Sequence, residues 1–172
     1  MRTRFLIAIG IGSALALGGA ALAQQPAPAP APAAPVAPPE YGPPITNEQA
    51  KAVAAAALAE AKKNNWRMAF SIVGPAGELV YFERMDGTQM ASADLAHGKA
   101  RTAAFYRRPT KIFAEQYAAG NTAFTTFPER PVASEGGLPI TLDGKIIGAI
   151  GVSGGTGQQD GVAAAAGVGA AK

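Results

Sequence analysis

The chain has 172 residues with 15 basic and 12 acidic side chains, one histidine and no cysteine. The lack of cysteine excludes disulfides, thiolate metal sites and cysteine nucleophiles, and the single histidine, His97, excludes any site that needs two imidazoles. A chain of this length can hold one folded domain once its unusual N-terminal part is set aside.

The first residues have the layout of a secretory signal peptide. Two arginines precede an apolar run from Phe5 to Leu17, and small residues follow up to Ala23. The apolar run is short for a membrane span. We therefore predict a signal peptide over residues 1–23, no stable membrane span after its cleavage, and a periplasmic or secreted protein.

Cleavage would also change the charge of the protein. Without the two arginines of the signal peptide, 13 basic and 12 acidic residues leave a net charge of +1. The basic character of the whole chain therefore resides in the segment that is removed. Nucleic-acid binding loses its main support, and no nucleic-acid partner is expected.

Residues 24–44 contain nine prolines among 21 residues, and alanine supplies most of the rest. Such a sequence favours extended polyproline II and buries little surface, so we expect a semi-rigid linker here. The folded domain is expected over residues 45–172.

The domain should begin with a helix and a β-hairpin. Thr46 is a suitable N-cap and forms a capping box with Gln49, so a helix should run from there to about residue 64. Two runs rich in β-branched and aromatic residues, 68–73 and 78–83, are joined by a Gly-Pro-Ala-Gly turn and predict the hairpin.

Two helices and one less legible stretch follow the hairpin. A helix is expected over about residues 92–106, since Pro109 blocks its continuation. A second helix is expected over 110–119, with Gly120 as its cap. Residues 125–127 are a candidate for a short strand.

The run from Gly136 to Asp160, GGLPITLDGKIIGAIGVSGGTGQQD, is the most informative part of the sequence. Its Asp-Gly pair between two β-branched segments predicts a hairpin with a type I′ turn. A glycine-rich loop comes next, and Thr156 with Gln159 forms a second capping box, which predicts a weak helix over 157–172. The loop would present N–H groups at a helix N-terminus, where anions bind. Close packing against a neighbouring strand, helix or subunit explains the glycines equally well.

The connections between the expected strands are hairpins rather than crossovers, so we expect an antiparallel sheet and the α+β class. The late run, together with Arg84-Met85-Asp86-Gly87 and Lys99-Ala100-Arg101-Thr102-Ala103, resembles the GlcG/HbpS family of heme-binding proteins, which includes the C-terminal domain of some cobalamin adenosyltransferases. The similarity covers residues 45–172. It departs at Gly161, where members usually have an acidic residue. The resemblance implies a profilin-like antiparallel sheet of about five strands with flanking helices, and a homo-oligomer.

His97 is the first candidate for ligand binding, because one imidazole suffices as an axial ligand of a heme iron. A histidine with a structural role on a helix face is the alternative. Met85 is a softer candidate for the iron. Four cations lie on or just after the helix of His97 and suit the propionates of a porphyrin or a small organic acid: Lys99, Arg101, Arg107 and Arg108. Lys99, Arg101 and Arg108 are the ones we include in the predicted site. A solvated helix face is the alternative for them. Gly154 and Gly155 of the loop complete the predicted site.

We interpret the protein as an exported binding protein for heme or a related tetrapyrrole, acting in sequestration or sensing. Two alternatives stay open. The glycine-rich loop and Lys99 could bind the carboxylate of a small hydroxy- or keto-acid in an enzyme or accessory factor. The glycine motifs could also serve subunit packing in a homo-oligomeric structural module. Asp86 could pair with Lys99 or bond its own backbone in a turn. No convincing enzyme signature is present.

Overall fold

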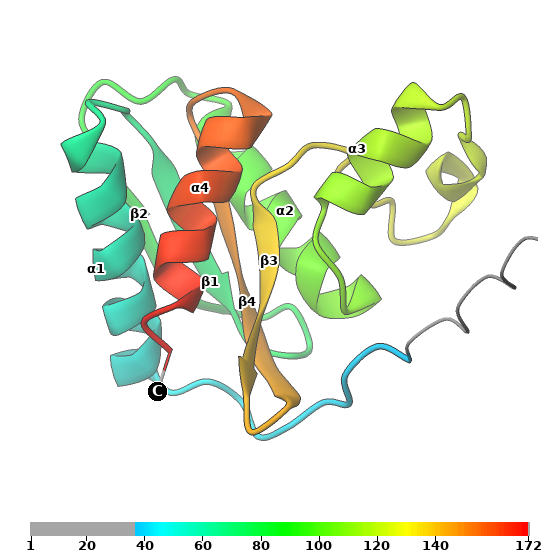
Figure 1. Cartoon of the computed structure of the whole chain (residues 1–172), viewed down its shortest axis with the longest axis horizontal. Helices are drawn as coiled ribbons and strands as arrows, with labels where there is room; N and C mark the ends of the chain where they lie inside the picture. The colour runs from blue at the N-terminus through cyan, green and yellow to red at the C-terminus, as the bar shows by residue number, and fades with distance from the viewer. Residues whose placement is uncertain (1–36, 172) are drawn as a thin grey trace, which may run out of the picture. The chain divides into compact units, whose positions relative to one another are not determined.

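The computed structural model of the chain describes residues 37–171 (Figure 1). The predicted signal peptide and residues 24–36 of the predicted linker lie outside this range. The described helices are α1 (Asn47–Lys63), α2 (Ser92–Tyr106), α3 (Lys111–Ala118) and α4 (Gly157–Val168), with a 3-10 helix, η1 (Ala123–Thr126). The strands are β1 (Ala69–Val73), β2 (Leu79–Arg84), β3 (Gly137–Leu142) and β4 (Lys145–Ser153).

The strands form one antiparallel sheet in the order β2-β1-β4-β3. The α+β class is confirmed. The prediction of about five strands is wrong for residues 37–171, where the sheet has four. The profilin-like arrangement stays a prediction of the resemblance.

The short strand that we expected over residues 125–127 is absent, and the 3-10 helix η1 covers residues 125 and 126 instead. The hydroxyl of Thr125 donates to the Thr122 carbonyl and that of Thr126 to the Ala123 carbonyl, each at 2.7 Å. These local bonds give the backbone and side chains partners without a neighbouring strand.

The local signals at helix starts and at the late turn are confirmed. Both capping boxes form, at Thr46 with Gln49 and at Thr156 with Gln159. Asp143 and Gly144 have φ angles of 51° and 75°, as a type I′ turn requires.

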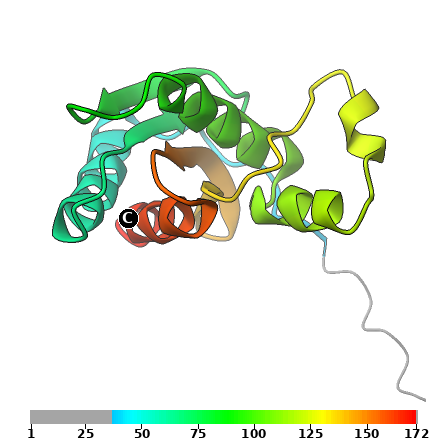
Figure 2. The same cartoon turned by 90° about the horizontal axis from the view of Figure 1, so that it is seen from above.

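Helices cover both faces of the sheet. α1 and α4 lie side by side on one face, and α2 crosses the other (Figure 2). The main core lies under α1 and α4 and includes Phe70, Ile72 and Ile150. The α2 face is packed with small side chains: Val73, Ala100, Ala103, Ala104 and Ala149.

Gly151 of β4 allows α2 to lie unusually close to the sheet. A Cβ atom at this position would stand 2.0 Å from the Ala96 carbonyl oxygen and 2.5 Å from the Ala100 nitrogen, both in α2. The backbone of the helix therefore rests directly on the backbone of the strand.

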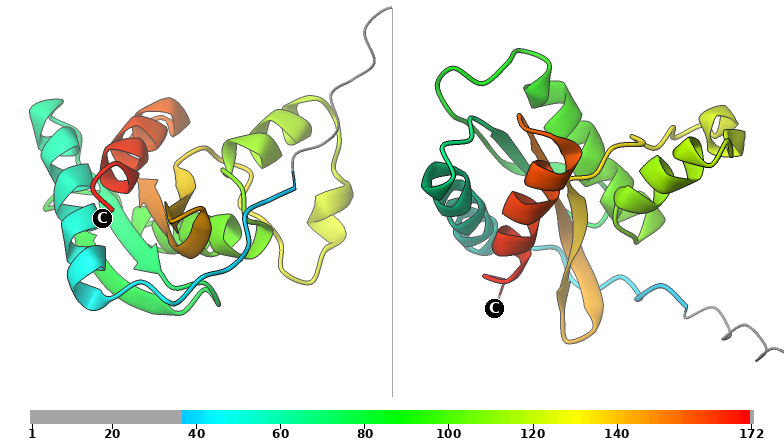
Figure 3. Two further views of the ribbon diagram at one scale, coloured as in Figure 1. Left: turned by 60° about the horizontal axis from the view of Figure 1, so that its bottom comes forward. Right: turned by 45° about the horizontal axis from the view of Figure 1, so that its top comes forward.

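The segment with α3 and η1 extends away from the sheet (Figure 3). Its start is tied to β3, since the Thr110 nitrogen donates to the Gly137 carbonyl at 3.0 Å and the Thr110 hydroxyl accepts from the Gly137 nitrogen at 2.9 Å. Aromatic rings hold the rest of the segment together, with Phe113 in edge contact with both Tyr106 and Phe124.

Contacts with the sheet begin before residue 45. The Ile146 nitrogen donates to the Glu40 carbonyl at 2.8 Å, and Tyr41 forms an isolated parallel bridge with Ile146. Among the described residues, every helix is too short or too polar to cross a membrane.

Candidate functional site

His97 lies on the edge of α2 that faces β1. Its Nδ1 is 3.2 Å from the hydroxyl oxygen of Ser71, a buried residue in the middle of β1. The imidazole is half-buried. Because Ser71 engages Nδ1, the ring is held in one orientation and Nε2 is left for a ligand.

Burial lowers the pKa of the His97 imidazole below 6.5, and the nearby Arg101 guanidinium lowers it further, while Asp94 acts in the opposite direction. The neutral ring is therefore the dominant form at neutral pH. A neutral imidazole is the form that binds a metal ion.

The surroundings of His97 combine a cation with an apolar side chain. Arg101 follows one turn later on α2, so the two side chains share a face. Phe82 of β2 is opposite Ser71 in the strand register and so lies on the same side of the sheet, with 38% of its surface exposed.

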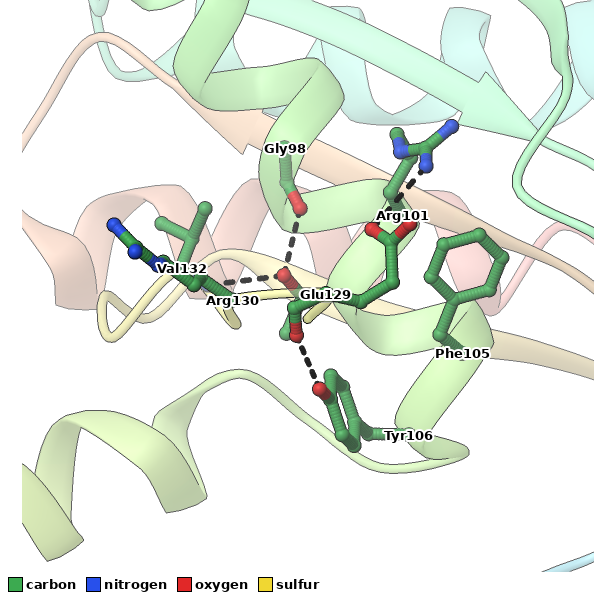
Figure 4. Close-up of a pocket in the computed structure, with 8 residues that line it drawn as sticks. Gly98, Arg101, Phe105, Tyr106, Glu129, Arg130 and Val132 are labelled. Atoms are coloured by element: carbon green, nitrogen blue, oxygen red, sulfur yellow. Dashed lines mark hydrogen bonds and ion pairs between the residues drawn. The ribbon is translucent and has the colours of Figure 1, made fainter. Parts of the chain in front are cut away.

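Arg101 also borders a small pocket of about 70 Å³ on the outer side of α2 (Figure 4). Its guanidinium carbon lies 4.8 Å from the centre of the Phe105 ring, and one nitrogen lies 3.4 Å from a carboxylate oxygen of Glu129. This ion pair is exposed, so it is weak, and Arg101 can exchange Glu129 for another anion.

Lys99 points the other way, into the protein. Its side chain is 2% exposed, and its ammonium donates to a carboxylate oxygen of Asp160 at 2.7 Å and to the Val152 carbonyl at 3.1 Å. Asp160 stands in the first turn of α4. The lysine therefore joins α2, the end of β4 and α4. Its carboxylate partner is Asp160, so of the alternatives left open for Asp86 the pairing with Lys99 is not formed.

The glycine-rich loop is engaged by the same carboxylate. The Gly155 nitrogen donates to the second oxygen of Asp160 at 2.9 Å. Burial raises the pKa of the Asp160 carboxyl above its ordinary value, and the Lys99 ammonium and the loop N–H groups act against that rise. A carboxylate of the chain itself thus accepts the Gly155 N–H group, which one of our two explanations of the loop assigned to an external anion.

Gly154 serves close packing. Its φ is 151°, and a Cβ atom there would lie 2.2 Å from the Arg67 carbonyl oxygen. Of the two explanations for the loop, close packing accounts for Gly154, and its neighbour is the segment that leads into β1. Ligand binding by Gly154, Gly155 and Lys99 stays a prediction.

The remaining predicted residues lie elsewhere. Met85 borders a groove of about 390 Å³ between the end of α1 and the end of β2, and its sulfur accepts from the Met68 nitrogen at 3.5 Å. Arg108 follows the C-terminus of α2 and lines an aromatic pocket beside α3. The structure therefore brings His97 and Arg101 together, and Lys99 with Gly155, but it separates these pairs from Met85 and Arg108.

Sequence reasoning missed two residues of this arrangement. Ser71 sits at the centre of an apolar strand, and a lone hydroxyl in such a run is a signal that a polar partner faces it. Asp160 follows a capping box at a position that suits the helix dipole, which gives no hint of a partner in α2.

Comparison with known proteins gives this fold a family. A family model described as haem degrading protein HbpS-like matches residues 45–169. The chain belongs to the HbpS-like family. GlcG of Escherichia coli K12 is 44% identical to it over 109 residues, which cover 63% of this chain and 81% of GlcG.

Solved structures of two similar proteins superpose on this HbpS-like chain. A double mutant of HbpS from Streptomyces reticuli has a TM-score of 0.68 and 31% identity, covering 83% of this chain and 97% of that one. A PduOC–heme complex has a TM-score of 0.68 and 25% identity, covering 74% and 94%.

The Lys99–Asp160 pair should behave as a buried ion pair in mutagenesis. Lys99→Met leaves an unpaired buried carboxylate and should lower the free energy of unfolding by about 3–5 kcal/mol. The double variant Lys99→Met/Asp160→Asn should recover much of this loss, because the amide keeps an acceptor for the Gly155 nitrogen and carries no charge. Urea unfolding measures both.

Lys63→Met is the control, since the Lys63–Glu60 pair is exposed and such pairs contribute about 0–1 kcal/mol. A double variant that is no more stable than Lys99→Met, or equal losses for Lys99→Met and Lys63→Met, would contradict the assignment.

His97 should make stability depend on pH. Its pKa is lower in the folded chain than its ordinary value of 6.5, so the unfolded chain binds more protons between the two values. Stability should be full above about pH 6.5 and should fall as the pH drops through the lowered pKa. In His97→Gln the free energy of unfolding should no longer contain the part that falls with pH because of this imidazole. Denaturant unfolding at several pH values between 8 and 5 checks it, and identical slopes in both proteins would exclude it.

Proposed function

We propose that this HbpS-like chain is an exported binding protein for heme or a related tetrapyrrole, acting in sequestration or sensing. The family name refers to haem, and one of the similar structures is a heme complex. The observation that carries the proposal is the state of His97, a half-buried imidazole oriented through Nδ1 by Ser71.

This histidine fits the requirements of an axial ligand. The ring must be neutral, must present one nitrogen and must be held by a hydrogen bond at the other. The lowered pKa meets the first requirement and the Ser71 hydroxyl meets the third. Bound heme would supply a redox-active iron at this position.

Arg101 and Phe82 are the residues beside His97 that suit the rest of a porphyrin. The guanidinium of Arg101 can take a propionate, since its present partner Glu129 is exposed. The Phe82 ring offers an apolar surface to the macrocycle. The proposed binding set is therefore narrower than the predicted one, because Lys99 and Gly155 already bond to Asp160 inside the protein.

A homo-oligomer is part of the proposal. His97 lies outside the linings of the four pockets described in residues 37–171. β2 is an edge strand of the sheet and exposes 56% of Leu79 and 38% of Phe82. A second copy against this edge would bury apolar surface and enclose a macrocycle beside His97.

A hemin titration of the purified protein tests the ligand. We expect a Soret band shifted from that of free hemin, because an imidazole enters the coordination sphere of the iron. His97→Ala should change that spectrum and weaken binding. Ser71→Ala removes only the hydrogen bond that orients the ring and should weaken binding on the order of tenfold.

Met85→Leu is the matched control for this titration, because it exchanges the other predicted iron ligand for an apolar side chain of similar volume. It should leave the spectrum and the affinity unchanged. A Soret shift that survives His97→Ala would move the iron ligand to another residue, and no shift with the unaltered protein would remove heme from the function.

Export has its own test. If residues 1–23 are a signal peptide, the intact mass of the protein from a bacterial periplasmic fraction should correspond to a chain that begins at Gln24. Full-length protein confined to the cytoplasmic fraction would contradict export without bearing on heme.

A further inference from the structure

The segment that extends from the sheet contains a pocket that the heme proposal does not use. It has a volume of about 280 Å³ and lies between the C-terminal end of α2, α3 and η1. We call it the α3 pocket. Its lining residues are Tyr106, Arg108, Phe113, Gln116, Asn121, Ala123, Phe124 and Phe127.

Aromatic rings form most of its walls, and their mutual contacts fix them. Tyr106 and Phe113 meet edge to face with 5.0 Å between ring centres, and Phe113 meets Phe124 in the same way at 5.6 Å. Phe127 stacks on Tyr106 at 6.2 Å. Rings arranged in this way offer both edges and faces to a further ring.

Arg108 is the sole charged residue in this lining. It is half-buried, and its Nε donates to the Tyr106 carbonyl at 3.0 Å, which fixes the plane of the guanidinium. Within residues 37–171 no ion pair involves Arg108. The remaining guanidinium N–H groups are donors for a carboxylate, which an arginine can bind through two parallel hydrogen bonds.

Two amides add neutral polar groups. The Asn121 side-chain oxygen accepts from the Ala123 nitrogen at 3.3 Å, so its NH₂ group is left as a donor. Gln116 lines the same space. The pocket thus offers one positive charge, neutral donors and apolar walls, with no acidic side chain in its lining.

We propose that the α3 pocket binds a small aromatic monocarboxylate, with its ring among the aromatic side chains and its carboxylate on the guanidinium of Arg108. The single cation matches one negative charge. The volume is just below the 300–1,000 Å³ usual for drug-sized ligands, which selects a ligand of one ring. A porphyrin does not fit a space of this size.

The α3 pocket is separate from the proposed heme site. Tyr106, which ends α2 and lines the α3 pocket, lies nine residues after His97, and nine residues of helix span roughly 14 Å. Ligand binding at the α3 pocket therefore does not depend on the heme proposal, and either can fail without the other.

Isothermal titration of the purified protein with phenylacetate, and with its neutral isostere phenylacetamide, tests the proposal. We expect phenylacetate to bind and phenylacetamide to bind at least about tenfold more weakly, as the loss of a charge-assisted hydrogen bond implies. Arg108→Gln should weaken phenylacetate binding to a similar degree.

Arg107→Gln is the matched control, because it removes the same charge one residue away. The Arg107 guanidinium lies over the Tyr41 ring and donates to the Pro39 carbonyl, and the residue is not part of the pocket lining. This variant should bind phenylacetate as the unaltered protein does, and so should His97→Ala.

Absence of phenylacetate binding, equal affinity for phenylacetamide, or equal losses in Arg107→Gln and Arg108→Gln would each overturn the proposal. If Arg108→Gln does not fold, the comparison of the two compounds on the unaltered protein still decides. Chemical-shift changes in NMR spectra should then fall on the rings of Phe113, Phe124 and Phe127 when phenylacetate is added.

Discussion

The buried pair of Lys99 and Asp160 is the interaction on which the arrangement of this protein depends. It connects the helix on one face of the sheet with α4 on the other, around the end of β4. Two charges that are almost fully buried require good geometry and full hydrogen bonding. Here the Val152 carbonyl and the Gly155 nitrogen supply the additional bonds. The loop between β4 and α4 is held by the same group that neutralises the lysine.

This pair also decides which parts of α2 remain free for a ligand. The face with Lys99 is used inside the protein, whereas His97 and Arg101 lie on the edge of α2 that faces β1. Beyond the C-terminus of the same helix, Arg108 turns to the aromatic rings near α3. The cations and the imidazole on α2 and just after it therefore lie in three different environments. One holds a buried ion pair, one a half-buried imidazole and one an aromatic pocket.

The parts of the fold set by neighbours in sequence could be predicted. The capping box of Thr46 with Gln49 and the turn at Asp143-Gly144 depend on residues one to three positions apart, and both are present. The partner of Lys99 could not be predicted in this way. Asp160 is 61 residues away, and only the packing of α4 against the end of the sheet brings it near.

The candidate site shows the same division. His97 and Arg101 are four residues apart on α2, so helical geometry puts them on one face, and this could be predicted from the sequence. Arg108 was placed with them on helical spacing, but α2 ends at Tyr106 and Arg107 adopts a left-handed conformation, which redirects the chain. The prediction of a strand near residue 125 was wrong, since the hydroxyls of Thr125 and Thr126 donate to nearby backbone carbonyls within a 3-10 helix.

The missing side chain at Gly151 limits how the imidazole can respond to a guest. Since the backbones of α2 and β4 touch at this point, the helix has no layer of side chains over which it could slide or tilt. His97 is therefore presented from a fixed height above the sheet. A ligand that binds beside His97 therefore cannot be accommodated by a shift of α2. Any conformational change on binding must occur in the ligand or in a second subunit.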